Sequence, residues 1–312
     1  MPRILVVAPN WIGDALMAQP LLARLKAGGA TLEVLAPEWV APVLRRMQEV
    51  DEVIAAPLRH GALQLGERWR LGRSLKRRGY DSAIVLPNTW KSALVPFLAG
   101  IPKRIGYVGE SRYGLLNSLH RSEKLPMARH YARLGGETAA ALPAPRLEVS
   151  AAEIAETRRR FGLEGRYTVF CPGAEYGPAK RWPYFGELAA RLAAPVVLLG
   201  SKNDAPAAAG IAGRNLVGQT TLDDAIWLIA GAAAVVSNDS GLMHVAAALG
   251  RPLVALFGSS SPEHTPPMSP RARVLWLRIE CSPCFQRDCP LGHFRCMKEL
   301  GVDQVLAALE AP

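Results

Sequence analysis

The chain contains the segment Ser237–Gly250, SNDSGLMHVAAALG, directly followed by Arg251–Gly258, RPLVALFG. The apolar run Ala233–Val236 just before it suits a buried parallel strand, and the polar residues that follow favour a turn and a helix cap. An apolar helix is then expected over Leu242–Leu249, with Gly250 ending it before the next strand. Strand, turn, helix and strand in this order predict a parallel α/β sheet.

The turn in this segment is a candidate ligand site. A helix that begins just past the carboxyl end of a buried strand offers free backbone N–H groups, and α/β sheets bind phosphates there. We expect a nucleotide diphosphate at this turn, with Asp239 placed to accept from hydroxyl or N–H groups and His244 one helical turn further on. The alternative is an ordinary capped turn, which the shape of the segment alone favours.

Length and composition limit the class of protein. A chain of 312 residues, 49% hydrophobic and 21% charged, is typical of a globular protein with about two domains. Its apolar runs stay well short of the ~20 residues that a membrane-spanning helix needs. The amino terminus leads straight into a strand, with an apolar run too short for a signal peptide. We therefore expect a cytoplasmic protein.

Positive charge is concentrated in the first half of the chain. The formal net charge is +10, of which residues 1–150 carry +9 and residues 151–312 carry +1. A basic half indicates an anionic partner, which can be a nucleic acid, an anionic membrane or a phosphorylated substrate. A solvated basic surface without a partner is the alternative.

Apolar runs and helical periodicity alternate along the chain. Besides the elements named above, strands are expected at residues 3–8, 31–36, 53–56, 82–86, 104–107, 167–171, 196–199 and 274–279. Helices are expected at residues 15–25, 63–78, 90–99, 130–141, 152–161, 183–192, 204–212, 222–230 and 302–309. Two prolines in 142–145 indicate a linker, so the expected α/β domains are 1–145 and 146–312. The last helix is expected to pack back on the first domain.

The first strand leads into Asn10–Asp14, NWIGD, and not into the G-x-G-x-x-G of dinucleotide-dependent dehydrogenases. Gly13 permits a tight turn, and Asp14 lies where the cap of the next helix would lie. Asp14 is therefore either a cap worth ~1 kcal/mol or a carboxylate that faces a cleft between the domains and acts as a general base. The residues alone leave both possibilities open.

Two loops of the second half carry further candidates. The loop Pro172–Pro183, PGAEYGPAKRWP, follows the first strand of that half, and Lys180 in it can neutralise a leaving diphosphate. The alternative is that Lys180 and Arg181 are an ordinary surface pair. Asp204 follows the next strand and is a candidate either for ribose hydroxyls or for helix capping.

Cationic side chains of the first half are candidates for holding an anionic ligand. The segment 67–78, ERWRLGRSLKRR, contains six basic residues, and such a cluster can hold phosphates, although most of a helical face is normally solvated. Further cations follow in loops and at strand ends. The candidate acceptor-binding residues are Arg68, Arg73, Lys76, Lys91 and Arg112.

Four cysteines are closely spaced near the carboxyl end. Cys281, Cys284, Cys289 and Cys296 have the spacing C-x2-C-x4-C-x6-C, with His293 among them. In a cytosolic protein such a cluster more often binds metal than forms disulfides. Four thiolates suit structural zinc or an iron–sulfur cluster. Free thiols in a packed loop are the alternative.

Taken together, these motifs resemble the ADP-heptose:lipopolysaccharide heptosyltransferases of glycosyltransferase family 9. The resemblance covers almost the whole chain and rests on NWIGD at Asn10–Asp14, GAEYGPAKRWP at Gly173–Pro183, NDSGLMHVAAALG at Asn238–Gly250 and C-x-P-C-F…C-P-x-G-H at Cys281–His293. It implies a GT-B fold, in which two Rossmann-like domains face a central cleft. The first domain would hold the acceptor and the second the nucleotide sugar.

The resemblance also implies the reaction. It is an inverting transfer of L-glycero-D-manno-heptose from ADP-heptose to a heptose already on the lipopolysaccharide inner core, and it needs no catalytic metal. Asp14 matches the general base of the family, Lys180 its diphosphate-binding lysine and Asp204 an acidic nucleotide contact. The residues that match the motif around ADP are Asp239, Ser240, Gly241, Leu242 and His244.

Two alternatives stay open. Heptosyltransferase I or another family-9 transferase would use a different acceptor, which only an acceptor assay distinguishes. A basic nucleic-acid-binding protein with a metal ribbon at 281–296 is the alternative of another class, but the sequence has no recognised nucleic-acid motif and no nucleic acid is expected. The expected partners are ADP-heptose, the anionic inner-core acceptor and, through peripheral contact, the inner membrane.

Overall fold

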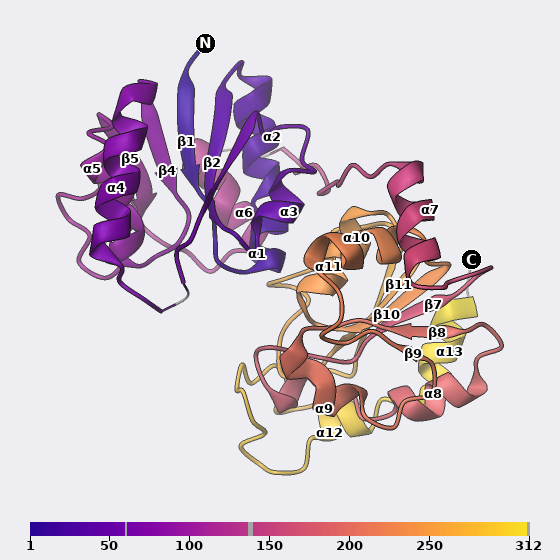
Figure 1. The fold of residues 1–312 in the computed structure, drawn as a ribbon. Helices are drawn as coiled ribbons and strands as arrows, with labels where there is room; N and C mark the ends of the chain where they lie inside the picture. The colour runs from indigo at the N-terminus through magenta and orange to yellow at the C-terminus, as the bar shows by residue number, and fades with distance from the viewer. Residues whose placement is uncertain (60, 137–139, 311–312) are drawn as a thin grey trace. The chain divides into compact units, whose positions relative to one another are not determined.

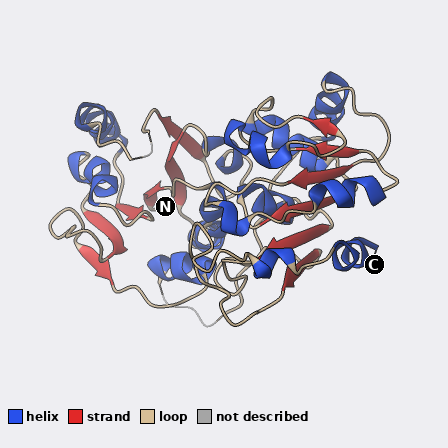
Figure 2. Ribbon diagram, turned by 90° about the horizontal axis from the view of Figure 1, so that it is seen from below, coloured by secondary structure: helices blue, strands red, loops and turns tan. Residues whose placement is uncertain are grey.

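The computed structural model describes residues 1–59, 61–136 and 140–310. The chain divides into two compact units, Met1–Pro143 and Ala144–Pro312. Each unit is an open, wholly parallel sheet of six strands with helices on both faces (Figures 1 and 2). The α/β class and the two parallel sheets are those that the sequence predicts. Among the described residues, every helix is too short or too polar to cross a membrane.

The first unit has the strand order β3-β2-β1-β4-β5-β6. Its strands are β1 (Arg3–Val7), β2 (Thr31–Pro37), β3 (Glu52–Ala56), β4 (Ser82–Val85), β5 (Lys103–Tyr107) and β6 (Ser118–His120). Its helices are α1 (Ile12–Met17), α2 (Gln19–Ala27), α3 (Ala41–Leu44), α4 (Leu65–Leu75), α5 (Leu94–Leu98) and α6 (Met127–Ala132), with 3-10 turns η1 (Lys76–Arg78), η2 (Trp90–Ala93) and η3 (Arg133–Gly135). Side chains of β1, β2 and β4 pack with α4 and α5 in one apolar core.

The second unit has the strand order β12-β11-β10-β7-β8-β9. Its strands are β7 (Thr168–Cys171), β8 (Val196–Leu198), β9 (Arg214–Asn215), β10 (Ala234–Asn238), β11 (Leu253–Phe257) and β12 (Ala272–Trp276). Its helices are α7 (Ala151–Arg160), α8 (Phe185–Arg191), α9 (Ala205–Ala208), α10 (Leu222–Ala230), α11 (Gly241–Ala248), α12 (Arg295–Lys298) and α13 (Val302–Glu310), with 3-10 turns η4 (Pro178–Lys180) and η5 (Lys202–Asp204).

Both sheets have the same strand order when strands are counted from the start of each unit, 3-2-1-4-5-6. This is the Rossmann order, in which all strands run in the same direction and the order of the strands in the sheet reverses between the first and the fourth strand. The reversal lies between β1 and β4 in the first sheet and between β7 and β10 in the second. Open α/β sheets bind their ligands at the carboxyl ends of these two strands, so the loops after β1, β4, β7 and β10 are the places to examine.

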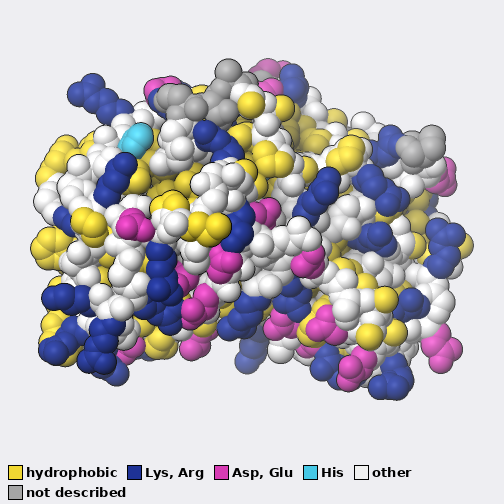
Figure 3. Space-filling view, turned by 90° about the horizontal axis from the view of Figure 1, so that it is seen from above, with side chains coloured by type: hydrophobic (Ala, Val, Ile, Leu, Met, Phe, Trp, Pro, Cys, Tyr) yellow, Lys and Arg dark blue, Asp and Glu magenta, His cyan; other side chains and the backbone are white. Residues whose placement is uncertain are grey.

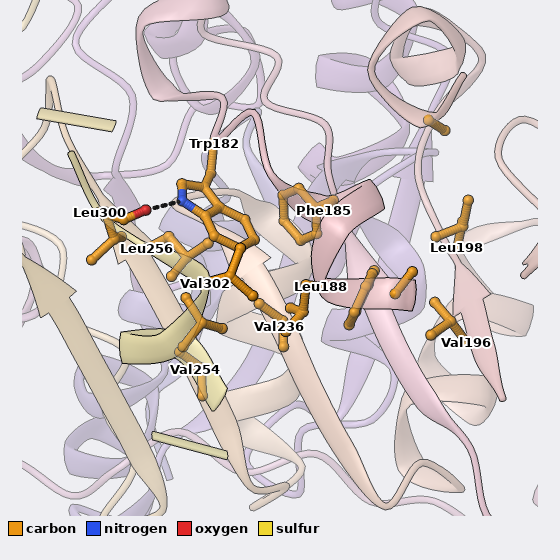
Figure 4. Close-up of a cluster of buried hydrophobic side chains, with 14 of the residues drawn as sticks. Trp182, Phe185, Leu188, Val196, Leu198, Val236, Val254, Leu256, Leu300 and Val302 are labelled. Carbon is orange, nitrogen blue, oxygen red and sulfur yellow. Dashed lines mark hydrogen bonds between the residues drawn. The ribbon is translucent and has the colours of Figure 1, made fainter. Parts of the chain in front are cut away.

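Trp182 anchors the core of the second unit (Figure 4). Its ring packs against Phe185 of α8, and its Nε1 donates to Leu300 O at 2.8 Å. Strand residues such as Val236 and α13 residues such as Val302 belong to the same cluster. The last helix, which was expected to pack on the first domain, thus buries its apolar face within the second unit, because it covers α8 and β11 there.

The structure differs from the expected elements at a few places. The helix expected over 15–25 is two helices that meet at Ala18, because Pro20 has no N–H to continue the first one. The helix expected over 130–141 ends in η3 at Gly135, and residues 137–139 lie outside the described part of the chain. The short elements β6, β9, α3 and α12 were not expected.

Candidate functional site

Lys180 and Asp239 meet at the strand reversal of the second sheet. Lys180 lies in η4 after β7, and Asp239 directly follows β10. Lys180 Nζ is 2.5 Å from Asp239 Oδ2, and the two side chains are only 16% and 6% exposed. Ser260 Oγ donates to the same carboxylate oxygen at 2.5 Å from the loop after β11. Lys180 is therefore a fixed, largely buried ammonium and not a surface cation.

Asn238, the last residue of β10, holds both ends of the loop that carries Lys180. Its side-chain amide donates to Pro172 O at 2.7 Å, and its Oδ1 accepts from the backbone N–H of Trp182 at 3.1 Å. Asn238 is fully buried. The sequence identified Asn238 only as a turn residue and did not identify Ser260 at all, because both roles depend on which strands are neighbours in the sheet.

His244 lies one turn into α11 and is buried. Burial lowers the pKa of its imidazole to about 4; Asp239 opposes this shift, and Lys180 adds to it. The imidazole is therefore neutral at neutral pH and close to the Lys180–Asp239 pair. The residues that begin this helix, Ser240, Gly241 and Leu242, are partly exposed, so the predicted diphosphate contacts lie on one helix end beside one cation.

Asp204 caps the short turn η5. Its Oδ2 accepts from both the backbone N–H and the hydroxyl of Ser201 at 2.8 Å. Its Oδ1 is buried and has no hydrogen-bond partner in the structure. Gly173 approaches this carboxylate so closely that a Cβ there would lie 2.1 Å from Oδ1. Capping, one of the two roles that the sequence left open, is thus observed, and the contact with ribose stays a prediction.

Asp14 is the third residue of α1 and is partly exposed. The cap position is Trp11, so Asp14 does not occupy the place that the sequence predicted for it, because the helix begins three residues earlier. Burial raises the pKa of Tyr131 in α6 well above its ordinary value, and the charge of Asp14 adds to this shift. Asp14 therefore lies near Tyr131, at the carboxyl end of β1, and its role as general base stays a prediction.

A cavity opens at the carboxyl ends of β1, β2 and β4 in the first unit. Its lining includes Asn10 and Thr89 and three cationic residues, Arg59, Arg68 and Lys91. Arg68 donates from Nε to Leu63 O at 2.7 Å and from Nη1 to Lys91 O at 2.9 Å, and burial lowers the pKa of its guanidinium. Arg68 and Lys91, two of the predicted acceptor contacts, thus line the same cavity. Arg59 lines it as well, and the sequence analysis did not identify it.

The other three predicted acceptor contacts do not line this cavity. Arg73 and Lys76 are exposed, and the guanidinium of Arg73 lies 4.8 Å from the centre of the Trp69 ring. Arg112 is only 1% exposed and donates to the carbonyl oxygens of Pro87 and Tyr107, each at 2.5 Å. The structure corrects the prediction for Arg112: its donors face backbone oxygens, and it has no surface with which to contact an acceptor.

Positive and negative side chains are mixed on the face of the molecule drawn in Figure 3. On the face drawn in Figure 3, Lys and Arg side chains stand among acidic and apolar ones rather than in one continuous basic area. Several basic residues of the first half are also paired: Arg78 bonds Glu33 and Glu52, and Lys26 bonds Asp51. Several cations of the first half thus serve ion pairs within the fold, and those on the face of Figure 3 do not form the continuous basic surface typical of a nucleic-acid-binding protein.

The four clustered cysteines line one small cavity in the second unit, together with Ala179 and Ser259. Burial, followed by the charges of the other three thiols, raises the pKa of Cys296 to about 11. Burial acts to raise the pKa of Cys289 as well, but backbone N–H groups of residues 291–294 outweigh it, so this pKa is lowered. Within the described residues, no group of three or more His, Cys, Asp or Glu side chains is arranged to hold a metal ion.

Two Rossmann-ordered units in one chain, with a cation and a helix end at the strand reversal of the second, define a two-domain protein of the GT-B class. The family model "Glycosyltransferase family 9 (heptosyltransferase)" matches residues 68–295. The chain is 46% identical to lipopolysaccharide heptosyltransferase 2 of Escherichia coli (strain K12), over 99% of this chain and 98% of that protein. It is 44% identical to lipooligosaccharide heptosyltransferase 2 of Haemophilus influenzae, over 88% of each.

A solved structure gives the same result. The structure of E. coli ADP-heptose LPS heptosyltransferase II superposes with a TM-score of 0.87 at 42% identity, and the match covers 98% of this chain and 97% of that one. The chain therefore belongs to glycosyltransferase family 9, the heptosyltransferases. These relatives give no support to the nucleic-acid-binding alternative.

Proposed function

We propose that this chain is an inverting heptosyltransferase that moves L-glycero-D-manno-heptose from ADP-heptose to the first heptose of the lipopolysaccharide inner core. The observation that carries the proposal is the fixed Lys180 ammonium beside the start of α11, at the strand reversal of the second sheet. A diphosphate is the ligand that such a place suits. The relatives named above are heptosyltransferases of type 2, which is the reason for choosing this acceptor.

The donor would bind to the second unit. An ammonium group has three donors, and Asp239 Oδ2 accepts only one of them. The remaining donors of Lys180 and the first N–H groups of α11 can hold the diphosphate of ADP-heptose. Asp239 keeps the ammonium in place, and Ser260 fixes Asp239, so the positive charge is preorganised before the leaving group develops its charge.

The acceptor would be activated by Asp14 of the first unit. Its carboxylate takes the proton of the acceptor hydroxyl while that oxygen attacks the anomeric carbon of the heptose. The bond from that carbon to the diphosphate oxygen breaks, and ADP leaves with the bonding electrons. A single displacement of this kind inverts the anomeric centre, and it needs no metal or other cofactor.

The cavity lined by Arg59, Arg68 and Lys91 would receive anionic groups of the acceptor, since the lipopolysaccharide inner core and lipid A are rich in phosphates and carboxylates. Exposed cations such as Arg73 and Lys76 would add attraction to an anionic membrane surface. We accordingly place the enzyme in the cytoplasm, in peripheral contact with the inner membrane. Both assignments rest on charge and on the proposed acceptor.

The test is transfer from ADP-heptose to Kdo-lipid A with and without the first heptose, for wild type, Asp14→Asn and Asp81→Asn. Asp81 is a matched control, because it lies at the amino end of β4, the opposite end of the first sheet. We expect turnover only with the heptosylated acceptor. Asp14→Asn should bind ADP normally and lose roughly 10²–10⁴-fold in transfer rate, whereas Asp81→Asn should keep it. Full transfer by Asp14→Asn would remove Asp14 from the mechanism.

A further inference from the structure

The cysteine-containing segment 281–296 contacts the loop after β11 through hydrogen bonds. The backbone N–H of Phe285 donates to Ser259 O at 2.7 Å, and Ser282 Oγ donates to Gly258 O at 2.6 Å. Trp276 Nε1 of β12 donates in turn to Ser282 Oγ at 2.8 Å. The next residue after Ser259 is the one that fixes Asp239, so this segment supports one wall of the Lys180–Asp239 site.

The same segment also supports the loop that carries Lys180. Tyr176 Oη donates to Phe285 O at 2.6 Å, and the N–H of Ala179 donates to Arg287 O at 3.0 Å. Gly177 approaches Arg287 so closely that a Cβ would lie 2.4 Å from its carbonyl oxygen. Residues just before Lys180 in the chain therefore take their position from segment 281–296.

Apolar burial does little to hold the segment itself in place. It is 16 residues long, and none of them is buried. Only its last two residues are helical, in α12. A loop of this length without regular structure is uncommon in a compact domain and is usually functional. Apolar burial cannot fix it, so either its hydrogen bonds suffice or a further link is present.

The four thiols provide the chemistry for that link. Cys281, Cys284, Cys289 and Cys296 line one cavity, whose lining also includes Ala179 and Ser259 from the two supported loops. The backbone N–H of Phe294 donates to Cys289 Sγ, 3.4 Å away, so this sulfur is held toward the chain that carries Cys296. Cys171, the fifth cysteine, lies apart in β7 and is buried.

We infer that these four thiols bind one thiophilic transition-metal ion, zinc or iron, which fixes segment 281–296 behind the two loops that carry Lys180 and Ser260. Binding releases the thiol protons and draws the four sulfurs to ~2.3 Å from the ion in a tetrahedral set. The thiols now line the cavity without standing in that arrangement. Binding therefore requires the four side chains to turn from their present positions toward one ion.

The test is the metal content of the full chain, purified without a histidine tag from cells grown with zinc and with iron. We expect about one equivalent of zinc or of iron per chain. Cys281→Ser and Cys289→Ser should lose at least 80% of it, and the matched control Cys171→Ala should keep it. Less than a tenth of an equivalent under both growth conditions would overturn the inference. Several irons with acid-labile sulfide would overturn the single ion in favour of a cluster.

A second measurement tests the supporting role without a variant that has to fold. A thiol-directed mercurial releases the metal from wild type, a thiol then removes the mercurial, and metal is added back. Metal-free protein should show a KM for ADP-heptose raised at least fivefold, with kcat changed less, and a lower Tm, both reversed by metal. Unchanged KM and Tm would overturn the supporting role. The KM measurement rests on the proposed function, because it assumes that ADP-heptose binds at the Lys180 site. The metal analysis does not depend on that function.

Discussion

Acid should destabilise the second unit through His244. Burial holds the pKa of this imidazole at about 4 in the folded chain, against an ordinary value of 6.5. Between these two values the unfolded chain binds a proton that the folded chain does not bind, so stability falls as the pH falls. The pKa difference of about 2.5 units corresponds to about 3 kcal/mol, all of it present above pH 6.5 and lost by pH 4.

Urea unfolding followed by tryptophan fluorescence measures this loss. The four tryptophans of the first unit are each at least 39% exposed, whereas Trp182 of the second unit is 3% exposed, so the signal reports mainly on the second unit. We expect the free energy of unfolding of wild type to fall by about 2–3 kcal/mol between pH 7 and 4.5 beyond the fall seen for His244→Asn. Comparing how the free energy of unfolding changes with pH in the two proteins removes the constant cost of the substitution itself.

His264→Asn is the matched control, because His264 is exposed in the same unit. This variant should keep the pH dependence of wild type. The explanation would be refuted if His244→Asn showed the same pH dependence as wild type. It would equally be refuted if NMR titration of the His244 ring gave a pKa near 6.5, since the imidazole would then be hydrated in the folded chain.

Substitutions at Lys180, Gly173 and Glu33, with partner or control variants, test three further contacts. Lys180→Met should cost about 3–5 kcal/mol, because it leaves Asp239 buried without its cation. Adding Asp239→Asn should restore stability but not ADP affinity in urea and calorimetric titrations, and restored affinity would contradict the role of the cation. Gly173→Ala should lower the free energy of unfolding by about 1–3 kcal/mol, because its Cβ would lie 2.1 Å from the capping carboxylate of Asp204. In the control Gly186→Ala the Cβ has no neighbour nearer than 4.0 Å, so stability should rise by up to ~1 kcal/mol. Equal melting temperatures for the two variants would refute the contact at Gly173. Glu33→Gln should cost about 2–3 kcal/mol, because this buried carboxylate accepts from two arginines and a tyrosine, and unchanged hydrogen exchange in β2 would contradict it.

The sheets could be predicted because their strands are local features of the sequence. A buried parallel strand is a short apolar run, and β1, β2, β4, β7 and β11 all read that way. The strands that were missed, β6 and β9, are short, and no residue in either is buried. The break at Ala18 depends on Pro20, a signal that was present in the sequence and was outweighed by the apolar periodicity around it.

The candidate site could be predicted only in part. Lys180 and Asp239 each follow a strand, and strand ends are visible in the sequence. Their pairing depends on β7 lying next to β10, which a local pattern does not specify. Arg112 shows the opposite case: it was expected to be a cation facing a cleft, but it lies between the carbonyl oxygens of Pro87, after β4, and Tyr107, at the end of β5. The type of a side chain predicts which ligand it can bind, but the residues packed around it determine whether it is exposed to that ligand.

The two strand reversals of this chain differ in charge, and this difference bears on the uneven charge of the sequence. The cavity at the first reversal has three cations and no carboxylate among its described lining residues. At the second reversal the cation is neutralised by Asp239 before any ligand arrives. An anion entering the first therefore meets net positive charge, whereas one entering the second meets a fixed dipole. Long-range attraction then belongs to the first unit and short-range orientation to the second, which suits a large anionic acceptor and a small nucleotide sugar.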